Sequence, residues 1–68
     1  MSEKVFKLVE LTGTSAKSVE DAVQTALTKA AETVGQLRWF EVVEIRGAVD
    51  QDKVSQWQVT VKIGTVEA

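Results

Sequence analysis

The amino-acid sequence predicts an α+β fold in which a three-stranded antiparallel sheet wraps around one helix. An apolar stripe with helical spacing occupies residues 18–34. Two long stretches with strand-like alternation follow it, and a shorter stretch rich in β-forming residues precedes it. A chain of 68 residues has room for one small domain, so residues 1–68 are expected to form a single domain in strand–helix–strand–strand order.

The first predicted strand covers residues 4–11 and ends at the small, polar stretch Thr12-Gly13-Thr14-Ser15. Alternation places Val5, Val9 and Leu11 on one face of this strand, and Phe6 and Leu8 on the other. A strand that is apolar on both faces is covered on both faces. In so short a chain, the second cover is expected to come from another subunit.

The stretch 12–15 precedes a helix and allows two interpretations. It could form an anion site at the helix N-terminus, or it could be a turn that leads into a helix cap. The spacing of a phosphate-binding loop is absent, and Ser18 already supplies a capping hydroxyl, so the second interpretation is favoured.

The predicted helix spans residues 18–34 and carries one apolar stripe, formed by Val19, Ala22, Val23, Ala26, Leu27, Ala30, Ala31 and Val34. Ser18 stands at the N-cap, and Asp21 three residues later resembles the partner in a capping box. Gly35 is a natural C-terminal stop. Because most of the stripe is Ala and Val, the sheet is expected to approach the helix closely and curl around it.

Residues 37–49 and 53–63 are predicted to form an antiparallel hairpin, with Asp50-Gln51-Asp52 as its turn. The second of these strands alternates strictly. Its apolar set should lie on the helix, and its polar set should face away from it. The apolar set is Trp57, Val59, Val61 and Ile63, and the polar set is Gln56, Gln58, Thr60 and Lys62.

The composition argues against catalysis. There is no Cys and no His, so the chain lacks a thiol nucleophile, an imidazole base and the usual ligands of zinc. Glu41 and Glu44 are an odd number of positions apart, which places them on opposite faces of a regular strand and disfavours a paired-carboxylate site. The protein is therefore not expected to be an enzyme.

Charge and hydropathy bear on partners and location. A net charge of −2 with scattered basic residues disfavours nucleic acid. No apolar run approaches the roughly 20 residues that span a membrane, and Met1-Ser2-Glu3-Lys4 lacks the layout of a secretion signal. We expect a cytoplasmic protein that binds neither nucleic acid nor membrane.

The aromatic and polar strand residues allow more than one role. Trp57 is most simply a core residue. Trp39 opens a strand beside Arg38, where an indole could cap the core, fill a subunit interface or stack on a flat ligand. Composition alone favours core or interface. Arg46 and Gln58, each taken alone, are more typical of solvated strand positions.

Several segments, in order and at matching spacing, resemble the dodecins, which are small flavin-binding proteins. The segments are Leu11-Thr12-Gly13-Thr14-Ser15, the Ala-rich helix, Leu37-Arg38-Trp39-Phe40-Glu41-Val42, Glu44-Ile45-Arg46-Gly47, and Trp57 to Gly64. The resemblance covers about Val5 to Gly64 and is of the bacterial type.

The resemblance implies a hollow dodecamer that binds FMN, riboflavin or FAD at subunit interfaces, with paired isoalloxazine rings between symmetry-related Trp side chains. It implies that Trp39 stacks on the ring, that Gln58 hydrogen-bonds the pyrimidine edge and that Arg46 lines the flavin and its phosphate. Indole stacking and a bidentate amide suit such a ligand. The implied function is flavin storage, sequestration and photoprotection; the alternative is a structural or interaction module that forms a cage without flavin.

The C-terminal tail departs from the family pattern. Many bacterial dodecins end in Gly-Phe-Arg, and that Arg is linked to coenzyme A and to contacts between trimers. Here the tail is Gly64-Thr65-Val66-Glu67-Ala68. The departure puts coenzyme A binding in doubt, and the contact between trimers is expected to be weaker or differently built.

Overall fold

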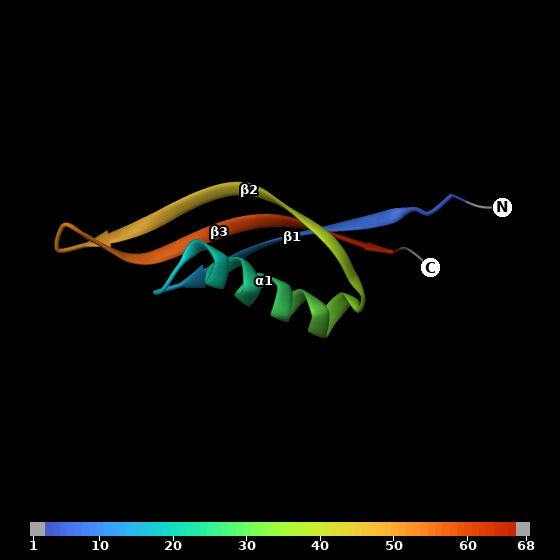
Figure 1. Cartoon of the computed structure of the whole chain (residues 1–68), viewed down its shortest axis with the longest axis horizontal. Coiled ribbons are helices and arrows are strands. Elements are labelled where there is room, and N and C mark those ends of the chain that lie inside the picture. Colours follow the sequence, from blue (N-terminus) through green and yellow to red (C-terminus); the bar gives the residue numbers. More distant parts are fainter. Residues whose placement is uncertain (1–2, 67–68) are drawn as a thin grey trace.

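The structure of the chain is a computed structural model that describes residues 3–66. The elements are β1 (Phe6–Ser15), α1 (Val19–Val34), β2 (Leu37–Asp50) and β3 (Lys53–Val66). The strands form one antiparallel sheet in the order β1-β3-β2, and α1 lies along one face of it (Figure 1). The predicted fold class is therefore confirmed. The start of β1 and the end of β3 lie at one end of the molecule and the β2–β3 turn lies at the other.

The core lies between α1 and the sheet face that we call the inner face. Val59, Val61 and Ile63 of β3 are completely buried there, and Trp57 packs against the same cluster. The helix contributes Ala22, Val23, Ala26 and Ala30, with Val19, Leu27 and Val34 at the margin. The predicted faces of α1 and β3 are thus confirmed, except that Ala31 lies beyond the edge of the stripe and is exposed.

The start of α1 follows the prediction in one respect and departs from it in another. Ser18 is the N-cap, and its hydroxyl accepts a hydrogen bond from the Asp21 amide at 3.0 Å. The Asp21 carboxylate does not close a capping box on Ser18. It accepts instead from the Ser15 hydroxyl at 2.7 Å, and the Ser15 oxygen also accepts from the Lys17 amide at 2.8 Å. Strand end and helix start are therefore tied together by Ser15.

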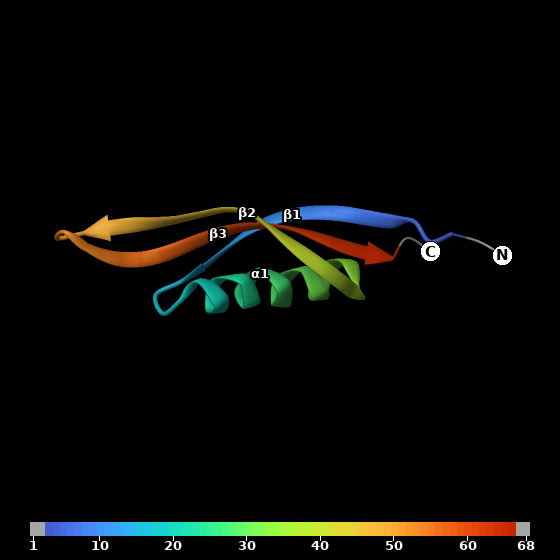
Figure 2. The same cartoon turned by 45° about the horizontal axis from the view of Figure 1, so that its top comes forward.

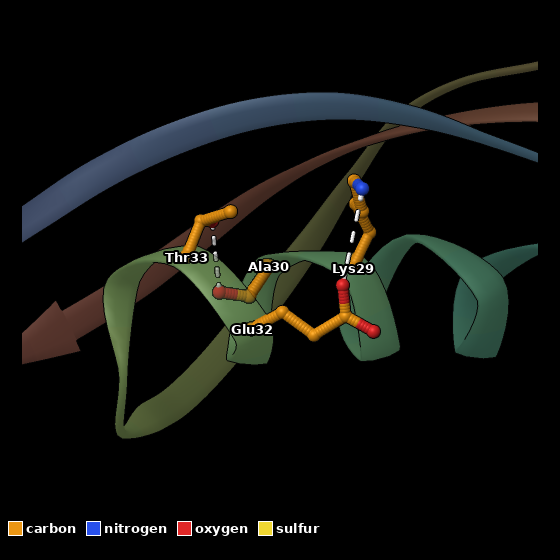
Figure 3. Close-up of polar contacts among 4 residues, drawn as sticks. All are labelled: Lys29, Ala30, Glu32 and Thr33. Atoms are coloured by element: carbon orange, nitrogen blue, oxygen red, sulfur yellow. Dashed lines mark hydrogen bonds and ion pairs between the residues drawn. The ribbon is translucent and has the colours of Figure 1, made fainter.

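The end of α1 is held by its own residues. The Thr33 hydroxyl donates to the Ala30 carbonyl at 3.2 Å, and Lys29 pairs with Glu32 at 3.8 Å (Figure 3). Gly35 ends the helix with a φ of 87°, in the region that favours glycine. The Lys29–Glu32 pair is well exposed, so it belongs to a solvated surface and adds little stability.

The prediction of a turn at residues 12–15 is wrong. This stretch continues β1, and Thr12, Gly13, Thr14 and Ser15 pair with Thr60, Val59, Gln58 and Trp57 of β3. Small residues are needed here because the helix backbone crosses the strand: a Cβ on Gly13 would lie 2.0 Å from the Ala22 carbonyl oxygen. The strand also starts later than predicted, at Phe6 rather than Lys4.

Register shifts interrupt β2 at three places, one of them between Val42 and Glu44. Val42 pairs with Val61 and Glu44 with Thr60, so Val43 is an extra residue in the strand. Glu41 pairs with Lys62, on the same face as Thr60. The prediction that Glu41 and Glu44 lie on opposite faces is therefore wrong, because the bulge changes the alternation between them.

The hairpin turn is one residue shorter than predicted. Asp50 still pairs with Lys53, and only Gln51 and Asp52 lie outside the ladder, with φ values of 52° and 63°. Positive φ at both central residues is the geometry of a two-residue hairpin that follows the strand twist. The hairpin projects past the start of α1 (Figure 2).

The helix covers β1 and β3 but scarcely reaches β2. As a result Phe40, Val42 and Ile45 are 47%, 40% and 52% exposed, although they pair with buried residues of the inner face. Phe40 and Val42 line an open apolar groove of about 610 Å³ together with Val19, Val23 and Leu27 of the helix.

Within residues 3–66, no helix is long and apolar enough to cross a bilayer.

Candidate functional site

The candidate residues all lie on the outer face of the sheet, which is the face turned away from α1. Gln58 belongs to the polar set of β3. Residues directly opposite one another in a ladder share a face. Arg46 is opposite Gln58 and Trp39 is opposite Gly64, so both side chains are on the outer face as well. All three positions that the dodecin resemblance singles out are thus on one surface.

Trp39 is seated on a glycine. A Cβ added to Gly64 would lie 2.2, 2.4 and 2.6 Å from Cε2, Cζ2 and Nε1 of the indole, so the ring occupies the space where any other residue would have its side chain. The Phe6 ring meets the indole edge-on, with centroids 6.1 Å apart and an angle of 66° between the planes. The indole remains 41% exposed. Trp39 therefore offers open aromatic surface while its position is fixed from below and from one side.

Gln58 and Arg46 form the second part of the candidate site. The row across the sheet at this level is Thr14, Gln58 and Arg46. Gln58 is partly buried, and its Nε2 donates to Oε1 of Gln56 at 3.0 Å. Arg46 is exposed. A carboxamide beside a guanidinium can hydrogen-bond the edge of a planar heterocycle and pair with an anionic group.

The two parts of the candidate site are far apart within one chain. Trp39 lies opposite Gly64 and Arg46 lies opposite Gln58, so the two rows are six positions apart along β3. At about 3.3 Å per residue this is roughly 20 Å. One chain therefore brings Arg46 and Gln58 together but does not bring Trp39 to them.

The bulge at Val43 is what places Trp39 and Arg46 on one face. They are an odd number of positions apart, and on a regular strand they would point to opposite sides. The extra residue between Val42 and Glu44 shifts the alternation by one position, so Trp39 and Arg46 point to the same face. The same irregularity that misled the prediction for Glu41 and Glu44 thus creates the common surface of the candidate site.

The surface between the two parts is polar. Glu10, Lys62 and Glu41 form one row across the three strands. In the next row the hydroxyls of Thr12 and Thr60 are hydrogen-bonded at 2.7 Å. Among residues 3–66 there is no group of three or more acidic, His or Cys side chains that could hold a metal ion.

Gly64 and Phe6 contact Trp39 and were not predicted from the sequence as its neighbours. A glycine inside an otherwise regular strand is a signal of close approach by another group, and Gly64 stands within β3. That signal indicates crowding at this position, but it does not indicate which residue causes it. Phe6 gives no comparable signal, because its contact with Trp39 depends on how three strands are aligned.

Comparisons with known proteins agree with the fold and the motifs. A sequence model of the family described as Dodecin matches residues 5–66. A dodecin from Thermus thermophilus is 48% identical over 61 residues, covering 90% of this chain and 88% of that protein. The structure of dodecin from Streptomyces coelicolor superposes with a TM-score of 0.92 at 38% identity, over 100% of this chain and 97% of that one.

A more distant neighbour is the calcium-chelating antigen calcium dodecin from Mycobacterium tuberculosis, whose structure has a calcium-binding site. It superposes with a TM-score of 0.80 at 28% identity, over 94% of this chain and 91% of that one.

Proposed function

The chain belongs to the dodecin family, and from that premise we propose that it binds flavin on the outer face of its sheet, storing and sequestering the cofactor and limiting its photochemistry. The observation that carries the proposal is the seat of Trp39. The indole is 41% exposed, and its ring lies over Gly64 in the space that a side chain at position 64 would occupy. A fixed, open indole is suited to stacking on a flat tricyclic ring.

The other two residues complete the recognition of a flavin. The pyrimidine edge of isoalloxazine presents carbonyl oxygens beside an imide N–H, and the Gln58 carboxamide offers the matching donor and acceptor. Arg46 would pair with the phosphate of FMN or FAD. Riboflavin lacks that phosphate, so the proposal includes all three flavins and assigns to Arg46 any preference for the phosphorylated ones.

A complete site requires more than one chain, because Trp39 and the Arg46–Gln58 row are roughly 20 Å apart. We therefore infer the hollow dodecamer of the family resemblance, in which a two-fold axis supplies each residue twice. The exposed apolar side chains support this inference: Phe6 and Leu8 on the outer face are 42% and 52% exposed, and Phe40 on the inner face is 47% exposed. These are the surfaces that a second subunit would cover.

The proposal includes neither catalysis nor coenzyme A. The side chains between the two parts of the site are carboxylates, a lysine and a hydroxyl pair, with no nucleophile positioned by a base. The tail that departs from the family pattern begins at Gly64, and its last two residues, Glu67 and Ala68, lie outside the residues that the structure describes.

The test is a titration of riboflavin and FMN followed by flavin fluorescence. The wild-type assembly should quench the fluorescence of both, because an indole stacked on the ring deactivates its excited state. Trp39→Ala should weaken binding by roughly 1–3 kcal/mol for each stacked ring. Trp57→Phe is the matched control, because Trp57 packs against the core, and it should bind as the wild type does.

Unquenched flavin at micromolar wild-type protein would contradict the proposal. The alternative is a cage without flavin, in which Trp39 fills a contact between subunits. The observation in favour of that alternative is that the indole already packs against a protein ring, the Phe6 side chain of its own chain. A flavin-free assembly of normal mass, whose Trp emission does not change when flavin is added, would establish it.

A further inference from the structure

The carboxamide of Gln58 is held by a neighbour on its own strand. Its Nε2 donates to Oε1 of Gln56 at 3.0 Å. The two residues are two positions apart, so they share the outer face, and both are partly buried. Among residues 3–66 this is the one hydrogen bond that the Gln58 side chain makes.

No side chain opposite Gln56 in the sheet competes with Gln58 for its carboxamide. Its partner on β2 is Ala48, whose methyl group cannot hydrogen-bond. On the other side β1 ends at Ser15, which is opposite Trp57, so β1 has no residue opposite Gln56. The Gln56 oxygen therefore has Gln58 as its side-chain partner, and no side chain opposite it competes.

This hydrogen bond affects which side of the Gln58 carboxamide donates and which side accepts. A carboxamide has a donor side and an acceptor side of nearly the same shape, and a half-turn exchanges them. While the Gln56 oxygen accepts one N–H, the Gln58 side chain presents its own oxygen and its second N–H in one order, and the reverse order requires both carboxamides to turn together. A ligand edge that carries an N–H beside a carbonyl is recognised only by one of the two orders.

We propose that Gln56 is a positioning residue that sets the donor–acceptor order of the Gln58 carboxamide, and thereby its recognition of an imide edge. The proposal rests on the proposed function for the identity of the ligand. What it requires at position 56 is a hydrogen-bond acceptor. Glu supplies one with the same reach, and Met has a similar length but presents only a weakly accepting sulfur.

The test compares wild type, Gln56→Glu and Gln56→Met in titrations with riboflavin and with N3-methylriboflavin, which lacks the imide N–H. Both probes lack phosphate, so the charge of Gln56→Glu has no phosphate to repel. The matched control is Gln24→Met, which removes an equivalent bond, from Gln24 Nε2 to the Thr28 hydroxyl at 3.2 Å, on the exposed face of α1. Assembly mass is measured for every variant.

Wild type should prefer riboflavin over N3-methylriboflavin by about tenfold, and Gln56→Glu and Gln24→Met should keep that ratio. Gln56→Met should weaken riboflavin binding by roughly fivefold and N3-methylriboflavin binding much less, so that the ratio falls. A purely structural role would weaken both ligands equally and leave the ratio unchanged.

Three results would overturn the proposal. One is an unchanged ratio in Gln56→Met. Another is an equal loss of the ratio in Gln56→Glu and Gln56→Met, which would show that an acceptor is not what position 56 supplies. The third is a wild-type protein that binds neither probe, which overturns the flavin proposal as well and is thereby distinct from the other two.

Discussion

The two tryptophans of this chain stand in the same local arrangement on opposite faces of one sheet. Each is directly opposite a glycine on the neighbouring strand: Trp57 is opposite Gly47, and Trp39 is opposite Gly64. Trp57 is on the inner face, packed against the core, and a Cβ on Gly47 would approach its ring only to 3.9 Å. Trp39 is on the outer face, and a Cβ on Gly64 would overlap its ring.

The difference shows that one kind of cross-strand pair can serve two purposes. Trp57 is held by apolar neighbours and would keep its place if its glycine gained a side chain. Trp39 is 41% exposed, and its ring lies in the space that a side chain at Gly64 would fill. The first pair therefore contributes mainly to the free energy of unfolding, and the second contributes mainly to the position of the exposed indole to which we assign ligand stacking.

The largest expected effect separates the tryptophans by stability. Trp57→Ala removes part of the core and should lower the free energy of unfolding by roughly 2–4 kcal/mol, whereas Trp39→Ala should lower it by about 1 kcal/mol or less. Denaturant unfolding of both variants at one protein concentration measures this difference. Equal losses would mean that Trp39 is as much a core residue as Trp57.

A smaller difference in stability is expected between alanine variants of the two glycines. Gly64→Ala must displace the indole, which can move because it is partly exposed, so we expect a loss of about 1–2 kcal/mol in stability together with a loss of flavin quenching. Gly47→Ala has more room, with its nearest contact 3.3 Å from the Gln56 carbonyl oxygen, and should stay within about 0.5 kcal/mol of the wild type. Normal quenching by Gly64→Ala would show that flavin binding does not require the Trp39 ring to lie over Gly64.

The smallest effect concerns the ring beside Trp39. Phe6→Leu keeps apolar bulk but loses the edge-on aromatic contact, which is worth roughly 0.5–1.5 kcal/mol. In a Trp57→Phe background, where Trp39 is the one remaining Trp, its fluorescence anisotropy should fall. Phe40→Leu is the control, since Phe40 is the other Phe of the chain and is on the inner face. An equal fall in anisotropy in both variants would show that Phe6 does not position Trp39.

Local signals predicted the parts of the fold that local rules govern. The helix was predictable because its apolar spacing, Ser18 and Gly35 are all near one another in the sequence. The inner face of β3 was predictable because Val59, Val61 and Ile63 alternate without interruption. The end of β1 was not, because Gly13 has the composition of a turn while its use is to let the helix backbone come close.

The residues of the candidate site were singled out by resemblance, and their relative placement could not be predicted from strand alternation. That Arg46 lies opposite Gln58 depends on where the strand register shifts, and alternation alone does not show a bulge. The contact of Trp39 with Gly64 depends on the same register. Trp39 and the Arg46–Gln58 row are too far apart within one chain to form a common site, so the site that we propose needs a second chain.

The extra residue in β2 has a consequence for how such a chain can change over generations. Losing one codon near Val43 would shorten a surface strand by one position, a change that an alignment would score as minor. With the bulge kept, it would also reverse which face each later residue of β2 points to. Arg46 would then point to the inner face, while Trp39 stayed on the outer face. In a strand with the bulge, the number of residues between Trp39 and Arg46 must therefore be even, and a design of the same length without the bulge would place the two residues of the candidate site on opposite faces of the sheet.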